Sequence, residues 1–460
     1  MIASGDTSLK NSDLPGLPNL SIKDFKQHRD NFFAKMHENS IALFPAAKEV
    51  TRSNDTEFKF CQNKSFYYLT GFNEPEALLI LLKRNNEQRA ILFSLPKDKG
   101  QEIWHGRRVG QEKACKDFGF DECYTLDEQN TLISEYFNGL VKVYFAFDDA
   151  KVTQQVFDLL AQVRATSRQG GKVPTTLADA SPIINEQRLI KSDNEIELMR
   201  QVNYISCLAH KRAMQKTQVG VFEYQIENEI LHEFTRFGAR SPAYATIVAG
   251  GDNANILHYT DNNDVLNDNE LLLIDAGGEL SGYAADITRT FPVNGKFTAP
   301  QKALYQLVLD AKTCVISAIK PGVSFAQLNS IANECLTKGL AELNILSGDL
   351  NELIKEKACK NYFIHGLGHW LGLDVHDVGD YQINEERAQL RSFEPGMVLT
   401  IEPGLYMPLD DSSLDEKWRG IGIRIEDNIV VTENGCENLS RFCPETIADI
   451  EALMQGQHNA

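Results

Sequence analysis

Two segments of this chain follow the same plan, and this internal duplication constrains the fold more than any other feature of the sequence. The first, LLLIDAGGELSGYAADITRTFPV at 271–293, is an apolar run that ends in an acid and a small turn, followed by a second run with another acid. The second segment spans 398–431 and contains VLTIEPGLYMP and GIGIRIEDNIVV in the same order. Short apolar runs bounded by turn residues are typical of β-strands. The pattern therefore predicts two equivalent hairpins in a duplicated half-domain.

Each predicted hairpin carries two carboxylates, Asp275 with Asp286 and Glu402 with Glu426. An acid within an apolar strand is costly to bury, because an unpaired carboxylate must take up a proton or find a cation. If the four acids meet near the local twofold axis, two divalent cations would balance their charge in a volume too small for several lysine or arginine side chains. For a single acid, the alternative is a turn cap or a pair with a nearby base such as Arg289, Arg419 or Arg424. For the duplicated set we favour a metal site.

The segment HGLGH at 365–369 adds two histidines to these acids. The glycines inside it argue against a stable helix and hence against a zinc-protease HExxH helix, whose glutamate is also missing. In an extended segment, Gly366 and Gly368 would let the backbone come close to a ligand while one imidazole binds metal. His376 follows within a dozen residues, and His258 precedes the first acidic strand.

The ligand types bear on the metal and on its chemistry. Carboxylate oxygens with a single imidazole suit hard or borderline divalent ions better than a cysteine-rich site does. Manganese is the first choice, and other divalent ions remain open. Two such ions bridged by a hydroxide would supply a nucleophile at neutral pH and polarise a carbonyl oxygen, which together describe hydrolysis of an amide.

The patterns along the whole chain predict an α/β (α+β) fold with two domains. Residues 1–20 contain LPGLP without a periodic apolar pattern and are predicted to be a flexible entry segment. From 21 to 175, apolar runs such as EALLILLK alternate with helical patterns such as 149–164, which is typical of a mixed α/β domain. The glycines and proline of SRQGGKVP mark its end. From 176 to 455, the helical patterns precede the strands, and they lie at 194–216, with Ser192 as cap, 222–237 and 300–319.

Charge and cysteine usage exclude several classes of partner. Lys and Arg total 46 against 64 Asp and Glu, a formal net charge of -18, which disfavours nucleic acid and anionic membranes as partners. No apolar run approaches the roughly 18 residues of a membrane span, and the first residues do not resemble a signal peptide. The nine cysteines include no CxxC pair, which suits a reducing compartment. We therefore expect a cytoplasmic protein.

Taken in order, the segments IDAG, ADITRTFP, HGLGHWLGLDVHD, TIEPGLY and RIEDN resemble the pita-bread metallopeptidases, specifically the aminopeptidase P family. The resemblance covers nearly the whole chain, since FYYLTGFNEPEALLIL at 66–81 and EIWHGRRVGQE at 102–112 are similar to the N-terminal domain of the bacterial type. It implies a mixed-sheet, creatinase-like N-terminal domain, followed by a pita-bread catalytic domain with pseudo-twofold duplicated halves. It also implies a homodimer or homotetramer.

The resemblance assigns roles to individual residues. The metal ligands for two manganese ions would be Asp275, Asp286, His369, Glu402 and Glu426, with Asp286 and Glu426 shared by both ions. Glu402 would also act as general base, and His258 and His376 would hydrogen-bond the substrate and the tetrahedral intermediate. The substrate would be bordered by His365, Arg424 and Tyr406. Trp104 would reach the pocket of a neighbouring subunit, although the sequence alone favours a packed aromatic, and relatives often have an aromatic residue in place of His105.

The expected activity is a proline-specific metallo-aminopeptidase that hydrolyses the bond between an N-terminal residue and a following proline. Because the nitrogen of this bond carries no hydrogen, general peptidases discriminate against it and a dedicated pocket is needed. The alternative is a prolidase, which has the same ligands but accepts only Xaa-Pro dipeptides. Methionine aminopeptidase shares the ligands but lacks a large N-terminal domain, and a non-catalytic peptide-binding domain would be expected to have lost ligands.

Overall fold

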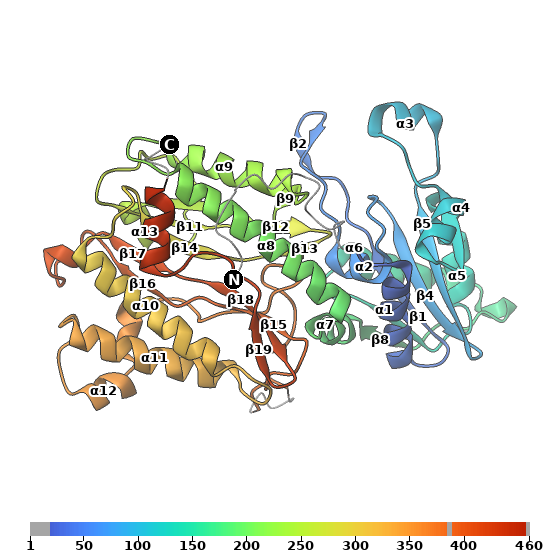
Figure 1. Ribbon diagram of the computed structural model, residues 1–460. Helices are drawn as coiled ribbons and strands as arrows, with labels where there is room; N and C mark the ends of the chain where they lie inside the picture. Colours follow the sequence, from blue (N-terminus) through green and yellow to red (C-terminus); the bar gives the residue numbers. More distant parts are fainter. Residues whose placement is uncertain (1–18, 384–388, 457–460) are drawn as a thin grey trace. The chain divides into compact units, whose positions relative to one another are not determined.

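The computed structural model describes residues 19–383 and 389–456, which divide into two compact units (Figure 1). The first unit is Leu20–Arg188, and the second begins at Leu189. The division lies beyond the predicted boundary at 175–176, because strand β8 (Thr176–Asp179) pairs into the sheet of the first unit. The predicted entry segment, 1–20, lies almost entirely outside the described residues.

The first unit is built on a six-stranded mixed sheet with the order β6-β5-β4-β1-β7-β8. Antiparallel pairs join β1 to β4 and β4 to β5, while β5–β6, β1–β7 and β7–β8 are parallel. The remaining strands of this unit are β1 (Ser40–Pro45), β4 (Leu78–Arg84), β5 (Glu87–Ser94), β6 (Glu122–Thr125), β7 (Lys142–Phe145) and the separate hairpin β2 (Thr51–Ser53) and β3 (Thr56–Glu57). The structure thereby confirms the mixed α/β domain that the sequence predicts and the mixed sheet that the family resemblance implies.

Strand β4 is buried on both faces of the sheet, which explains its continuous apolar run. Ile80 packs in one cluster with Val156 of α6, and Leu79 and Leu81, which point to the other face, are also fully buried. A strand buried on both faces loses the alternation of apolar and polar residues. The helices of the unit are α1 (Ile22–Lys35), α2 (Lys64–Thr70), α3 (Lys99–His105), α4 (Gln111–Phe118), α5 (Gln129–Phe137), α6 (Ala150–Ala165) and α7 (Ser181–Leu189).

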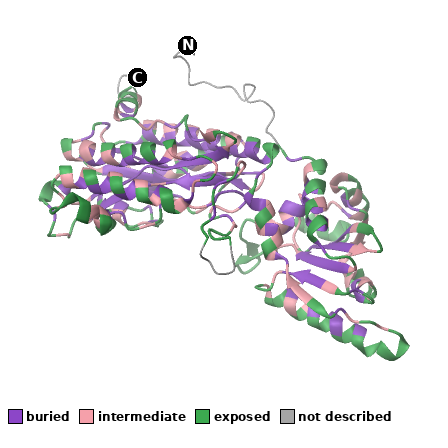
Figure 2. Ribbon diagram, turned by 90° about the horizontal axis from the view of Figure 1, so that it is seen from below, coloured by how far each residue is buried: buried purple, intermediate pink, exposed green. Residues whose placement is uncertain are grey.

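In the second unit, small antiparallel sheets lie between the helix pair α8 and α9 and the pair α10 and α11 (Figure 1). Buried residues concentrate in the strands, and the outer helix faces are exposed (Figure 2). The strands are β9 (Ser241–Pro242), β10 (Ile247–Gly250), β11 (Leu271–Asp275), β12 (Gly278–Leu280), β13 (Tyr283–Ala284), β14 (Thr288–Pro292), β15 (Val398–Ile401), β16 (Gly404–Met407), β17 (Ile421–Arg424), β18 (Asp427–Thr432) and β19 (Gly435–Asn438).

The predicted helices of this unit are confirmed to within two residues at each end. In α8 the side chain of Ser192 accepts a hydrogen bond from the Glu195 amide, as expected of an N-cap. The helices are α8 (Asp193–Lys216), α9 (Glu223–Arg236), α10 (Ala299–Ser317), α11 (Phe325–Glu342), α12 (Leu350–Lys355) and α13 (Ile447–Gln455). None of the helices in the described part of the chain is long and apolar enough to cross a membrane.

The two acidic segments adopt the same local arrangement, as their sequences predict. In the first, β11 pairs with β14 and Asp275 lies opposite Thr288. In the second, β15 pairs with β18 and Ile401 lies opposite Asp427. A hydrogen bond of 3.0 Å from the Glu426 amide to the Thr288 carbonyl joins the two arrangements. The duplicated strands therefore bring their acid-bearing ends to one place.

Candidate metal centre

A cavity of about 350 Å³ in the second unit is lined by all five predicted metal ligands. The ligands lie where strands end or are interrupted. Asp275 is the last residue of β11, Glu402 directly follows β15, and Glu426 lies between β17 and β18. Asp286 lies just before β14. At such positions a side chain can leave the sheet and enter a cavity while the strand fixes its backbone.

Of the other predicted site residues, four line the cavity, whereas Tyr406 lies beside it and Trp104 lies in the first unit. The cavity is also lined by His258, His365, His376 and Arg424. Tyr406 does not line it, but its hydroxyl contacts both His365 and Arg424. Trp104 lies on α3 in the first unit, where its side chain is 82% exposed, so it is not the packed aromatic that the sequence alone favours.

His369 belongs to an extended segment that runs beside β15. The Thr400 amide donates to the His369 carbonyl at 2.9 Å, and the Glu402 amide donates to the Leu367 carbonyl at 2.9 Å. A Cβ atom on Gly368 would lie 2.0 Å from the Thr400 carbonyl oxygen. Glycine is therefore needed here for the approach of two backbone segments. The expectation that Gly368 makes room for a ligand is replaced by this packing role, and no atom lies within 4 Å of such a Cβ at Gly366.

The ligand atoms approach one another closely. One ligand atom each from Asp286, His369 and Glu426 lies within 4.8 Å of the others. His369 Nε2 is 3.3 Å from Asp286 Oδ2 and 3.6 Å from Glu402 Oε1. The other ring nitrogen, Nδ1, lies 2.9 Å from the Trp370 carbonyl oxygen, to which it can donate only if it carries the proton. Nε2 is then the nitrogen that remains for a metal ion.

The electrostatics of the cavity show a shortage of positive charge. Burial raises the pKa of Glu402 to about 7, with the charge of Asp286 adding to the effect and that of His369 opposing it. Burial and the neighbouring carboxylates raise the pKa of Glu426 well above its ordinary value. Burial would lower the pKa of His369, yet its contacts with Asp286 and Glu402 raise it to about 9. Divalent cations would relieve this repulsion and replace the proton on His369, so the donor set fits them.

Arg424 links two of the predicted ligands. Its Nη2 donates to Asp275 Oδ2 at 2.7 Å, and its Nε donates to Thr288 Oγ1 at 3.1 Å. The Thr288 hydroxyl in turn donates to Glu426 Oε2 at 2.6 Å. Because the guanidinium is almost fully buried, these bonds fix the direction of both carboxylates.

The same guanidinium determines the tautomer of His365. Arg424 Nη1 donates to the Tyr406 hydroxyl oxygen at 2.9 Å, so the hydroxyl proton is free to point at His365 Nε2, 2.8 Å away. Nδ1 of His365 then carries the proton and donates to the Gly366 carbonyl at 2.7 Å. Burial and the charge of Arg424 lower the pKa of His365 to about 3. The ring is therefore neutral at physiological pH.

Three residues of this centre are absent from the sequence-based prediction. Tyr244 donates its hydroxyl to Asp275 Oδ1 at 2.5 Å. Thr400 Oγ1 accepts from the His369 amide at 3.0 Å and donates to Glu402 Oε1 at 3.3 Å. Thr288 is the third, and its hydroxyl joins Arg424 to Glu426. The two threonines lie two residues from an acid, so strand alternation could have found them. Tyr244 precedes β10 and has no such signal.

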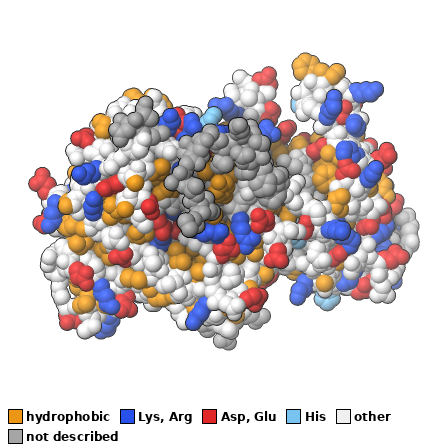
Figure 3. Space-filling view, in the orientation of Figure 1, with side chains coloured by type: hydrophobic (Ala, Val, Ile, Leu, Met, Phe, Trp, Pro, Cys, Tyr) orange, Lys and Arg blue, Asp and Glu red, His pale blue; other side chains and the backbone are white. Residues whose placement is uncertain are grey.

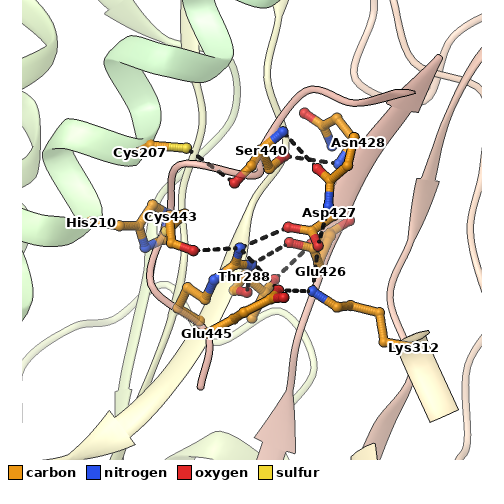
Figure 4. A network of polar contacts seen from close by, with 12 residues as sticks. Cys207, His210, Thr288, Lys312, Glu426, Asp427, Asn428, Ser440, Cys443 and Glu445 are labelled. Carbon is orange, nitrogen blue, oxygen red and sulfur yellow. Dashed lines mark hydrogen bonds and ion pairs between the residues drawn. The ribbon is translucent and has the colours of Figure 1, made fainter. Parts of the chain in front are cut away.

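A second group of charges, of which all but Glu445 are buried, lies next to Glu426 (Figure 4). Arg289 Nη2 pairs with Asp427 Oδ1 at 2.7 Å, and Lys312 pairs with both Asp427 and Glu445. Figure 4 shows Lys312 reaching from its helix toward the two carboxylates. Burial alone would raise the pKa of Asp427, but the charges of Arg289 and Lys312 hold it well below its ordinary value. Arg289 also donates to the carbonyl oxygens of Glu426 and Thr288, at 2.6 and 3.0 Å.

The observed ion pairs test the alternative that nearby arginines, instead of metal ions, neutralise the four acids. Arg289 pairs with Asp427 and not with a predicted ligand. Arg419 donates to the Leu414 carbonyl. Arg424 does pair with one ligand, Asp275. Among the described residues, an arginine or lysine therefore pairs with one of the four acids, Asp275.

Comparison with known proteins gives consistent matches along the chain. The sequence pattern of metallopeptidase family M24 matches residues 197–433, and that of the aminopeptidase P N-terminal domain matches residues 25–144. The chain is 46% identical to the Xaa-Pro aminopeptidase of Escherichia coli (strain K12), over 95% of this chain and 98% of the relative. It is 36% identical to Xaa-Pro aminopeptidase 3 of Homo sapiens, over 87% of this chain and 78% of the relative.

Solved structures agree with these sequence matches. Aminopeptidase P from E. coli with the inhibitor Pro-Leu superposes with a TM-score of 0.93 at 45% identity, over 96% of this chain and all of that chain. Proline aminopeptidase P II from Yersinia pestis gives a TM-score of 0.91 at 48% identity, over 95% of this chain and all of that chain. A zinc-substituted form of the E. coli enzyme in complex with product gives 0.92 at 46% identity, over 95% of this chain and 99% of that chain.

Proposed function

The chain belongs to metallopeptidase family M24 and is an Xaa-Pro aminopeptidase, and we propose that its five clustered ligands hold two divalent cations at the bond to be cleaved. The bond joins an N-terminal residue to a following proline. The observation that carries the proposal is the convergence of Asp275, Asp286, His369, Glu402 and Glu426 on one cavity. Their repulsion in the absence of cations supports the charge of the proposed ions.

The residues around the proposed cations are assigned different roles in hydrolysis. When bound, divalent cations would supply a nucleophilic water of lowered pKa and polarise the carbonyl of the scissile bond. Asp286 and Glu426 are proposed to be shared ligands, and His369 offers Nε2. Glu402, which lines the cavity beside His369, is proposed to accept the proton of the attacking water. Glu402→Ala should lose bound metal and lower kcat by more than the ~10²- to 10⁴-fold of general base catalysis alone.

Two further histidines of the cavity are proposed to hydrogen-bond the substrate and the developing oxyanion. His376 lies with its ring 4.1 Å from that of His369. Burial, with the charge of His369, lowers the pKa of His376, so its ring is neutral at physiological pH and can donate one N–H. His258 also lines the cavity, at the surface. His365 is proposed to line the proline side of the cavity. Arg424 is proposed to support the surrounding network, and Tyr406, whose hydroxyl contacts both residues, is proposed to border the site.

Paired substrates test the activity and its alternative. Purified protein loaded with manganese is incubated with the tripeptide Arg-Pro-Pro and with an Xaa-Pro dipeptide. Release of arginine from the tripeptide is expected. Cleavage of the dipeptide alone would instead favour a prolidase, although the relatives do not. Cleavage of Met-Ala peptides without activity on Xaa-Pro peptides would contradict the proposed specificity.

Manganese is the proposed physiological metal, because the ligands are carboxylates with a single imidazole. A relative has been studied in a zinc-substituted form, so metal identity needs its own test. The chain is stripped with a chelator and reconstituted separately with manganese and with zinc. Elemental analysis should find two divalent ions per chain, and kcat should be higher with manganese. Equal activity of both forms would contradict the choice of manganese, and an absence of bound divalent ions would favour a non-catalytic binding domain.

We further propose a cytoplasmic homodimer or homotetramer in which Trp104 contributes to the pocket of a neighbouring subunit. Ile103 and Trp104 on α3 are 80% and 82% exposed, which is unusual for large apolar side chains. Hydrophobic side chains gather at the tip of α3 (Figure 3). Light scattering should give a mass above the 51.6 kDa of one chain. Trp104→Ala should raise KM, and a fully active monomer would contradict the proposal.

A further inference from the structure

We propose that Glu223, a buried carboxylate distant in sequence from the predicted site, is a positioning residue that holds His258 in its working orientation. The inference rests on the proposed role of His258 in substrate binding. His258 lies in a segment, 251–264, that has no strand and only one short 3₁₀ helix, Gly251–Asn255. Its side chain is exposed to the cavity. Regular secondary structure therefore cannot orient His258, and other contacts must do so.

One oxygen of Glu223 holds the beginning of this segment. Glu223 is the first residue of α9, and its side chain is fully buried. Oε1 accepts hydrogen bonds from the Gly250 amide at 2.7 Å and from Asn253 Nδ2 at 3.1 Å. These contacts fix the point at which the chain leaves β10.

The other oxygen of Glu223 holds the end of the segment. Oε2 accepts from the Tyr259 hydroxyl at 2.8 Å and from the Asp264 amide at 2.9 Å. The Glu223 amide also donates to the Asp264 carbonyl at 3.0 Å. Tyr259 is buried and directly follows His258 in the chain. One carboxylate thus accepts hydrogen bonds from the chain on both sides of His258.

The geometry requires a carboxylate at this position. Four donors converge on Glu223, and an ionised carboxylate is an acceptor at both oxygens. A glutamine would turn an NH₂ group toward one pair of donors. The Tyr259 hydroxyl could rotate and accept instead, but the amides of Gly250 and Asp264 cannot, so one of these amides would lose its acceptor. The place of Glu223 in the first turn of α9 also favours a negative charge.

The test compares two acid-to-amide changes on the same helix. Glu223→Gln should lower kcat on an Xaa-Pro tripeptide about 10- to 100-fold, because small displacements of positioning groups have effects of this size. Glu229→Gln is the control, since Glu229 on α9 pairs with Arg212 away from the segment. It should leave kcat unchanged. Metal content is measured in both variants, because Ile247 of β10 lies opposite Asp275 and a disturbed strand would release metal.

A double-mutant cycle separates positioning from general destabilisation. In a His258→Ala background, Glu223→Gln should lower kcat less than about twofold, since the group that it positions is gone. An equal loss in both backgrounds would overturn the inference while leaving the role of His258 intact. If His258→Ala alone has wild-type activity, the proposed function of His258 fails, and this inference fails with it.

A milder variant keeps the test valid if Glu223→Gln does not fold. Tyr259→Phe removes one donor to Glu223 and keeps the buried ring. It should lower kcat by a smaller factor than Glu223→Gln, with full metal content, and this loss should also disappear in the His258→Ala background. A loss that persists there, or a loss of metal, would overturn the inference.

Discussion

Replacing Asp427 with asparagine should destabilise the second unit strongly, although the change adds no bulk. Asp427 and Arg289 have side chains that are 0% exposed, and Lys312 is 2% exposed. The amide would leave two buried cations facing a neutral group. Removing one partner of a buried ion pair costs about 3–5 kcal/mol.

The structure places the expected cost at the lower end of that range. Lys312 would keep its contact with Glu445, whose side chain is 37% exposed. Arg289 would keep the backbone carbonyls and a more distant contact with Glu445, at 3.9 Å. We therefore expect about 3 kcal/mol, which lowers the melting temperature of a unit of this size by about 6–12 °C.

Thermal unfolding of the metal-free protein, followed by tryptophan fluorescence, measures this shift. Trp370 and Trp418 are buried in the second unit, whereas Trp104 is exposed in the first and should report little. Glu437→Gln is the matched control, because Glu437 pairs with Arg200 and Arg441 near the surface, where ion pairs contribute about 0–1 kcal/mol. A melting temperature for Asp427→Asn within about 2 °C of the wild type would refute the reasoning.

Three further substitutions test the contacts around the proposed cations. Thr288→Val removes the hydroxyl between Arg424 and Glu426 and should weaken metal binding about 10- to 100-fold in a chelator competition; unchanged affinity would contradict its role. Tyr406→Phe deprives His365 of its donor and should lower kcat/KM on a tripeptide about 10-fold at full metal content; loss of metal would mean that the hydroxyl supports the ligands instead. His376→Ala should lower kcat about 10²- to 10³-fold with metal retained, and wild-type turnover would remove it from the mechanism.

The sequence predicts those parts of the molecule that repeat or that lie close together in the chain. The duplicated strands predict the meeting of four acids, because acids at equivalent strand ends occupy equivalent places. The start of α8 follows from Ser192, the predicted cap, whose side chain accepts from the Glu195 amide three residues later. Strand alternation also contained the information for Thr288 and Thr400.

The remaining features depend on contacts between distant segments. Glu223 and Asp264 are brought together only by the register of the folded unit. The same is true of Tyr244 and Asp275. Gly368 shows a further limit of prediction from sequence. A glycine in a histidine-containing segment indicates that another group comes close, but the sequence does not identify that group. In the structure that group is the backbone of β15.

The adjacent acids Glu426 and Asp427 lie in two different electrostatic environments. Successive residues near a strand point to opposite sides, so Glu426 faces the cavity and Asp427 faces the interior. On the interior side the chain supplies its own cations, Arg289 and Lys312, on rigid elements. Among the described residues that line the cavity, Arg424 is the one permanent cation, and its ion pair is with Asp275.

The difference in charge between the interior and the cavity fits the proposed function of the cavity. A lysine or arginine long enough to neutralise Glu426 and Glu402 would fill the volume in which we propose that the scissile bond is cleaved. A small divalent ion delivers more charge in less space and leaves room for substrate. Among the described residues, the carboxylates of the cavity other than Asp275 therefore lack cations of the chain's own, which keeps the cavity open. Arg289, on the interior side, donates to the Glu426 carbonyl and so fixes the backbone of this proposed ligand.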